Sequence, residues 1–163
     1  MSRNEIHDSD RAELAEFIDQ HWFGVDVFVL GQRHLPHEAN GFVDRRDGRI
    51  VGALTYRLDG DGMHILTVNS TMEGQGVGSA LMLSATEQAR RLGCRRIWLT
   101  TTNDNLRAIG FYQRLGFRIV AVRLDGVGEM RKCKPRIPDC GERGVPIQDE
   151  IVMELKLEPY LDA

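Results

Sequence analysis

Apolar side chains recur at helical spacing near the start of the chain. The stripe from Leu14 to Trp22 follows a 3.6-residue period, so we expect a helix from about Ser9 to His21. The next segment, Phe23–Asn40, follows neither the helical nor the strand period, and it predicts a short helix or an ordered loop.

Three short strands with turn residues between them follow. Gly41–Asp44 and Ile50–Tyr56 flank the turn dipeptide Asp47–Gly48. Met63–Val68 comes after a second turn at Asp59–Gly62. Because strands joined by short turns pair with their neighbours in sequence, this region predicts a three-stranded antiparallel meander.

The next part of the chain changes to helical and strand segments in alternation. An apolar stripe from Val77 to Leu92 predicts a helix that ends at Gly93. Arg96–Thr101 predicts a strand. Its short connection to the helix indicates a parallel neighbour of the strand at Met63–Val68.

A further helix and two strands are expected toward the end of the chain. The helix should carry the apolar stripe from Leu106 to Leu115, with Asn103 or Asp104 as its N-cap. The strands are expected at Phe117–Leu124 and Ile151–Leu157.

Three glycines at every second position lie between the strand that ends at Val68 and the following helix. Gly74, Gly76 and Gly78 have no Cβ, so backbone N–H groups there can approach a ligand closely. The helix N-terminus adds unpaired donors and a partial positive charge. The junction therefore predicts a binding site for phosphate or pyrophosphate.

Composition narrows the classes of partner. The 163 residues carry a net charge of -3, with 42% hydrophobic and 28% charged residues, which is ordinary for a soluble domain. The charge gives no basic patch for nucleic acid, and no apolar run could span a membrane. Since no stretch near Met1 resembles a signal peptide, we expect a cytoplasmic protein. Cys94, Cys133 and Cys140 lack metal-ligand spacing, so neither a metal site nor a disulfide framework is predicted.

Two other phosphate-binding classes fit the glycine junction poorly. Its Gly-x-Gly-x-Gly spacing differs from the Gly-x-Gly-x-x-Gly of dinucleotide-binding domains. No acidic residue ends the strand at Ile97–Thr101, where such a domain would hold a ribose. The Gly-Lys-Ser/Thr of nucleotide-triphosphate loops is absent from the sequence.

Two motifs in order resemble the GCN5-related N-acetyltransferase (GNAT) superfamily. Leu66-x-Val68 followed by Glu73–Gly78 resembles the family's strand and its (Gln/Arg)-x-x-Gly-x-(Gly/Ala) loop. Asn105–Phe117 matches Asn-x-x-Ala-x-x-Phe-Tyr-x-x-x-Gly-Phe. The resemblance is specific over Arg49–Leu124. It implies an α/β fold with a mixed, mostly antiparallel sheet flanked by helices, in which the parallel central strands splay apart.

The resemblance also implies acetyl-CoA as the acyl donor, with no metal. Edge groups of Val68 would pair with the pantetheine arm and the thioester carbonyl. Leu66 belongs to the same implied cofactor-binding set, and the Asn105 amide would contact the arm. Backbone N–H groups of the loop would hold the pyrophosphate, from Gly74, Gln75, Gly76, Val77, Gly78 and Ser79. Glu73 departs from the family's Gln or Arg. Because a carboxylate repels a pyrophosphate, its side chain should point away and cofactor affinity should be lower.

Tyr112 matches the family tyrosine that donates a proton to the departing sulfur. A phenol of pKa ~10 stays protonated at neutral pH, although Tyr112 would also suit a core aromatic position. His64 is the expected general base, because family members often place a base on this strand. Strand alternation would put it on the same face as Val68. An ordinary half-exposed histidine is the alternative. Further candidates for the base are His34, His37 and Glu38.

The long segment Asp125–Glu150 should border the acceptor pocket, since long connections in compact domains are usually functional or mobile. Its basic run Arg131–Arg136 would attract an acidic acceptor or a cofactor phosphate, or be solvated surface. Trp22, Phe23 and Phe28 would line an apolar acceptor pocket or pack in the core.

These expectations together describe one N-acetyltransferase domain over residues 1–163. It would transfer acetyl from acetyl-CoA to a primary amine by direct attack in a ternary complex. The acceptor would be a small-molecule or peptide amine, with neither nucleic acid nor membrane as a partner, and homodimers are common in proteins of this resemblance. The alternative is a catalytically silent acyl-CoA-binding sensor of the same fold.

Overall fold

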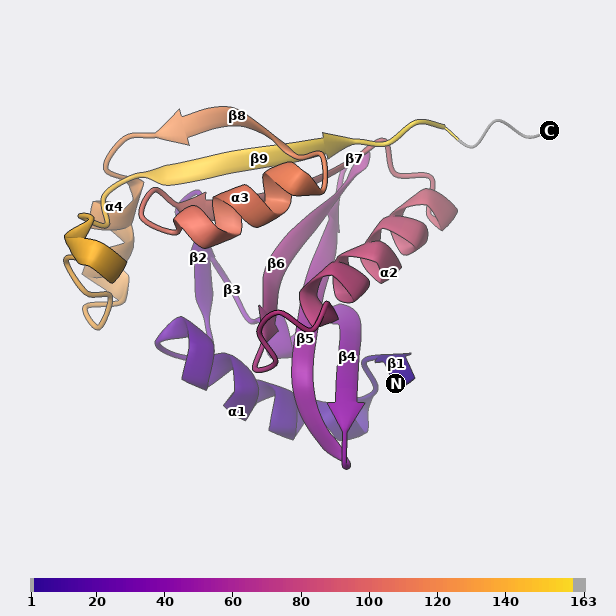
Figure 1. The fold of residues 1–163 in the computed structure, drawn as a ribbon. Coiled ribbons are helices and arrows are strands. Elements are labelled where there is room, and N and C mark those ends of the chain that lie inside the picture. The colour runs from indigo at the N-terminus through magenta and orange to yellow at the C-terminus, as the bar shows by residue number, and fades with distance from the viewer. Residues whose placement is uncertain (1, 160–163) are drawn as a thin grey trace.

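A mixed sheet flanked by helices forms the fold in the computed structural model, which describes residues 2–159. Within these residues the sheet has seven strands in the order β1-β4-β5-β6-β7-β9-β8 (Figure 1). Its strands are β1 (Ser2–Glu5), β4 (Asn40–Arg46), β5 (Arg49–Asp59), β6 (Gly62–Ser70), β7 (Arg96–Thr102), β8 (Arg118–Arg123) and β9 (Glu150–Lys156). The α-helices are α1 (Arg11–Trp22), α2 (Val77–Arg91), α3 (Leu106–Arg114) and α4 (Gly126–Cys133).

All neighbouring strands of the described sheet are antiparallel except β6 and β7. The expected fold class is therefore confirmed, including the meander β4–β5–β6 and the parallel central pair. A separate hairpin is formed by β2 (Val27–Val29) and β3 (Gln32–His34). Short 3-10 turns occur at Asp8–Asp10, Pro36–Glu38 and Glu142–Gly144.

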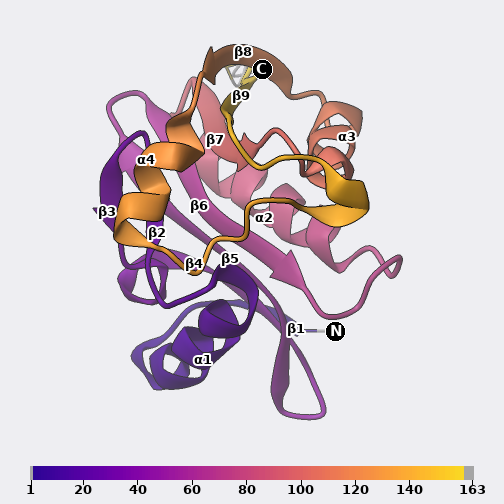
Figure 2. The ribbon, with the colours of Figure 1, turned by 90° about the vertical axis from the view of Figure 1, so that its left-hand side faces the viewer.

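Alternation along β4 and β5 divides the apolar core between the two sheet faces. Phe42 and Leu54 pack in the larger cluster, which α2 and α3 cover. Their neighbours Val43 and Ala53 pack with α1 in a second cluster on the other face. Figure 2 shows α1 on one side of the sheet, with α2 and α3 on the other side.

The two parallel strands pair over only part of their length. Partners run from Gly62–Arg96 to His64–Trp98, although β6 continues to Ser70 and β7 to Thr102. Beyond that last pair the strands diverge, so the backbone edges that face each other there are free of ladder bonds. The predicted splay of the central strands is confirmed, and it opens toward the glycine junction.

The expectation that His64 and Val68 lie on the same face of β6 is wrong. Thr67 pairs with Thr55 but Ile65 pairs with Tyr56, so β6 holds an extra residue at Leu66. Such a bulge reverses the alternation that follows it. Ile65 and Val68 therefore both pack toward α2 and α3, and His64 lies on the face opposite to Val68.

Two segments contain more regular structure than expected. Phe23–Asn40 holds the β2–β3 hairpin rather than chiefly a loop or helix. The segment Asp125–Glu150 begins with α4, so its irregular part is confined to the residues after Cys133. Two glycines within α4 weakened the helical signal in the sequence.

Candidate active site

The glycine junction forms an open backbone turn that leads into α2. Gly74 and Gly76 have φ of 70° and 76°, a left-handed conformation that glycine adopts without strain. A Cβ at either position would meet no atom within 4 Å. The first bond of α2 runs from Ala80 N to Gly76 O at 3.0 Å. The N–H groups of residues 77–79 therefore have no acceptor in the helix and are available to an anion.

The free edge of β6 and the start of α3 lie on either side of the strand splay. Val68 pairs with Leu54 of β5 on one side, and its other side faces the gap toward β7. Asn105, and not Asn103 or Asp104, caps α3 by accepting a hydrogen bond from Ala108 N at 3.2 Å. The Asn105 side-chain NH2 is left as a donor beside the gap.

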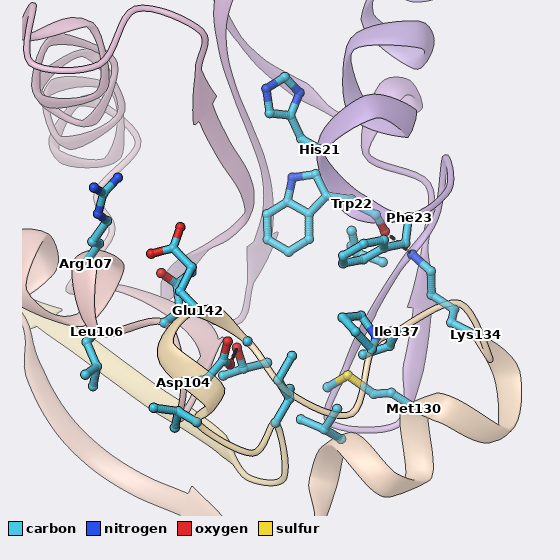
Figure 3. A pocket seen from close by; sticks show the side chains of 18 of the residues that line it. His21, Trp22, Phe23, Asp104, Leu106, Arg107, Met130, Lys134, Ile137 and Glu142 are labelled. Carbon is cyan, nitrogen blue, oxygen red and sulfur yellow. Dashed lines mark hydrogen bonds between the residues drawn. The ribbon is translucent and has the colours of Figure 1, made fainter.

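A cavity of about 750 Å³ adjoins the splay. Figure 3 shows it between the C-terminal end of α1, the start of α3 and the segment that follows α4. Asn69 at the end of β6, Thr102 at the end of β7 and Asn105 all line it. The Trp22 indole N–H donates a hydrogen bond to the Asn69 side-chain oxygen, which fixes the ring at the cavity wall. The expected aromatic lining by Trp22, Phe23 and Phe28 is present.

Lys134 ties α4 to the end of α1. Its ammonium donates to the carbonyl oxygen of Trp22 at 2.6 Å and to that of Asp26. The Asp26 carboxylate lies 3.6 Å away. Burial lowers the pKa of Lys134, and Asp26 opposes that shift. The two carbonyl oxygens and the Asp26 carboxylate engage the ammonium of this cavity residue, so it offers little to an anionic ligand.

Arg131 of α4 has a comparable structural role, because it binds the segment that follows the helix. Its guanidinium donates to the carbonyl oxygens of Pro138 at 2.7 Å and Ile147 at 2.6 Å. Arg131 and Lys134 are two of the four cations of the basic run, and both donate hydrogen bonds to backbone carbonyl oxygens. The run is therefore neither simple solvated surface nor a free phosphate-binding cluster.

Asn103, predicted as a helix cap, instead anchors the segment that follows α4. This segment, residues 134–149, lines one side of the cavity and is called the roof below. Its side-chain oxygen accepts hydrogen bonds from Gln148 N and Asp149 N, each at 2.9 Å. Its side-chain NH2 donates to Pro146 O at 2.9 Å. No local pattern predicts this contact, because the partners lie more than 40 positions away.

Comparison with known proteins identifies the family. The model of the Acetyltransferase (GNAT) family matches residues 4–117. The chain belongs to the GNAT family. The uncharacterized protein YdhI of Bacillus subtilis is 37% identical over 140 residues, which are 85% of this chain and 88% of that protein.

Further relatives extend the comparison. Mycothiol acetyltransferase of Saccharomonospora viridis is 30% identical over 115 residues, covering 63% of this chain and 38% of that protein. A GNAT acetyltransferase from Elizabethkingia anophelis with acetyl-CoA bound has the same fold, with a TM-score of 0.67. It is 18% identical, and the match covers 96% of this chain and 97% of that one.

Tyr112, the predicted acid of this GNAT protein, lies on α3, and its side chain is part of the larger core cluster. It is 8% exposed and packs between Phe111 and Phe117, with ring centroids 5.3 and 5.7 Å away. Burial raises the pKa of Tyr112 above its ordinary value, so the phenol stays protonated at neutral pH. Tyr112 does not line the cavity, and its catalytic role stays a prediction.

His64 is buried away from the cavity. Its ring stacks on Trp98 of β7 at 3.7 Å, and His34 of β3 meets it edge-on at 5.6 Å. Burial, with the charges of His34 and Arg57, lowers the pKa of His64 to about 3. The histidine is therefore neutral at physiological pH but holds a proton weakly. Its role as general base stays a prediction, and these observations weigh against it. None of the further candidates His34, His37 and Glu38 lines the cavity.

His21 is a cavity residue that the sequence did not single out. It lies in the last turn of α1, and its Nδ1 is 2.7 Å from Phe17 O. A carbonyl oxygen only accepts, so Nδ1 must carry a proton and the neutral ring keeps a lone pair on Nε2. The one sequence signal for this contact is the spacing of four residues between Phe17 and His21, which is about one helical turn.

We expect Glu73→Gln to tighten binding of acetyl-CoA, by up to about tenfold. The Glu73 carboxylate lies 3.4 Å from the guanidinium of Arg107 on α3, and both side chains are largely exposed. Such a pair adds only ~0–1 kcal/mol to stability, but it holds a negative charge beside the loop and pairs with the Arg107 cation. Calorimetric titration of both proteins measures the change in Kd. Glu87→Gln, on the exposed side of α2, is the matched control. Weaker binding by Glu73→Gln would show that the carboxylate itself assists the cofactor.

Proposed function

We propose that this GNAT protein is an acetyl-CoA-dependent N-acetyltransferase that acts on a primary amine, with residues 1–163 serving as one domain. The observation that carries the proposal is the junction of an open glycine turn with the splay of β6 and β7, next to a cavity large enough for an acceptor. The acetyl-CoA-bound structure with the same fold supports it. In residues 2–159 no cluster of potential metal ligands occurs and no helix could cross a membrane.

The residues present fit acetyl-CoA in two ways. The glycines leave space where side chains would collide with a pyrophosphate, and the N–H groups of residues 77–79 point their partial positive charge to the same place. The unpaired edge of β6 from Leu66 to Val68 offers backbone groups to an extended arm, and Asn105 offers its amide. When bound, acetyl-CoA supplies the acetyl group as a thioester.

Side chains of this protein would then accept and donate the protons that acetyl transfer requires. The acceptor arrives as an ammonium ion and gives one proton to Nε2 of His21, to His64 or to water. Its nitrogen bonds to the acetyl carbon as the carbon–sulfur bond breaks, and Tyr112 gives a proton to the departing sulfur. The nitrogen's second proton restores the Tyr112 phenol. One proton is released overall, and the products are an amide and a free thiol.

A thermal-shift titration tests the cofactor first. A ligand that binds only the folded state at 100-fold over its Kd adds about 2.7 kcal/mol of stability. We expect acetyl-CoA and coenzyme A to raise the melting temperature, and NAD and ATP to leave it unchanged. If no CoA species shifts the transition, the acetyltransferase proposal fails.

A further inference from the structure

The cavity has an apolar side and an acidic side. Figure 3 shows Trp22, Phe23 and Ile137 facing Asp104 and Glu142 across the space. The apolar lining also includes Val27, Phe28, Met130, Val145 and Ile147. Its volume of about 750 Å³ falls within the range of small-molecule sites. The lining therefore suits a compact ligand with one polar end.

The two carboxylates of the acidic side, Asp104 and Glu142, are available to a ligand because the nearby cations do not pair with them. Lys134 is bound to backbone carbonyls and to Asp26, and Arg107 lies against Glu73. Arg143, on the 3-10 turn at Glu142–Gly144, also lines the cavity, but its side chain is exposed, so solvent screens its charge. Neither Asp104 nor Glu142 forms an ion pair within residues 2–159. A cation is the ligand group that these two carboxylates would favour.

Asp104 is held in a fixed position at the cavity wall. The Thr102 hydroxyl donates to one oxygen of its carboxylate. Gly141 of the roof passes so close to the other oxygen that a Cβ there would overlap it. Asp104 also lies between Asn103, which anchors the roof, and Asn105, the expected contact of the acyl donor's arm. Its carboxylate therefore lines the same cavity as Asn105, the residue expected to contact the acyl donor's arm.

We propose that the acceptor is a small primary amine with an apolar body, whose ammonium group binds Asp104 and whose body packs on Trp22, Phe23 and Ile137. This inference rests on the proposed acetyltransferase function. A primary amine of pKa ~10 arrives charged, and its desolvation inside a cavity needs a carboxylate partner. The anchored roof leaves a bounded space, which favours a small molecule over a polypeptide.

A series of n-alkylamines from ethylamine to hexylamine tests the apolar body, with release of coenzyme A thiol as the assay. Each methylene that enters the cavity should raise kcat/KM about fourfold until the space is filled. Ethanolamine and 1,6-diaminohexane should be poorer acceptors than the alkylamines of equal length, because they place a polar group on the apolar side. A flat series, or better turnover of a peptide with a free N-terminus, would overturn the proposal.

Asp104→Asn tests the anchor while keeping the shape of the side chain. We expect KM for hexylamine to rise about ten- to a hundredfold, the range for loss of a charge-assisted hydrogen bond. Inhibition by the uncharged analogue 1-hexanol should be unchanged. Glu87→Gln removes a remote carboxylate and should leave both values as in the unmodified protein. Equal effects of Asp104→Asn on the amine and the alcohol would indicate a structural role and overturn the anchor.

Failure of the two proposals can be told apart by the acetyl-CoA titration. A protein that binds no CoA species contradicts the acetyltransferase function itself. A protein that binds acetyl-CoA and acetylates polar amines as fast as hexylamine contradicts only the acceptor class.

Discussion

Replacement of Gly78 by aspartate should abolish binding of acetyl-CoA without unfolding the protein. Gly78 is the second residue of α2, where the N–H groups are expected to hold the pyrophosphate. A carboxylate about 4 Å from a phosphate costs on the order of 4 kcal/mol at an effective dielectric constant of 20. We expect Kd to rise at least about a hundredfold, measured by calorimetry and by loss of the thermal shift.

The folded state should tolerate this change. A Cβ at Gly78 would lie 3.5 Å from Phe111 Cζ, an ordinary contact, and the residue needs no left-handed backbone. Aspartate in the first turn even favours the helix dipole. Gly78→Ala is the size control, and it should weaken binding less than Gly78→Asp. Normal acetyl-CoA binding by the aspartate variant would remove the phosphate site from this loop.

The order of elements could be predicted from the sequence because local signals agree with the fold. Asp47 and Gly48 have positive φ in the turn between β4 and β5, as their dipeptide predicts. The parallel partner of β6 followed from the short connection after α2. Such features depend on neighbours in sequence, which is why single-sequence reasoning reaches them.

The composition of the site could be predicted less well, because it depends on contacts between distant residues. The bulge at Leu66 turns His64 to the other sheet face. No residue type in β6 predicts this bulge. Asn103 and Lys134 acquire their positions from partners that pattern and period do not identify. The motif residues were named from family resemblance, whereas the cavity walls needed the tertiary structure.

Tyr112→Phe should lower the rate of acetyl transfer by about 10²- to 10⁴-fold, the usual contribution of a general acid. Burial raises the pKa of the Tyr112 phenol, so the phenol stays protonated at neutral pH and its proton is present when the thiolate departs. Phenylalanine preserves the packing against Phe111 and Phe117. Kd for acetyl-CoA should therefore stay within about twofold of the unmodified value.

The control for this loss is a second buried tyrosine of the same core. Tyr56 is 6% exposed and stacks on Phe42, at a ring-centroid distance of 6.3 Å, away from the cavity. Tyr56→Phe removes a second buried hydroxyl and should leave turnover unchanged.

Because the pKa of Tyr112 is raised, ionisation of this phenol should not reduce the rate as the pH rises from 7 to about 10. Unchanged turnover in Tyr112→Phe would exclude the tyrosine as the acid. A protein that binds acetyl-CoA but shows no transfer to any amine, with or without Tyr112, would instead be the silent acyl-CoA sensor.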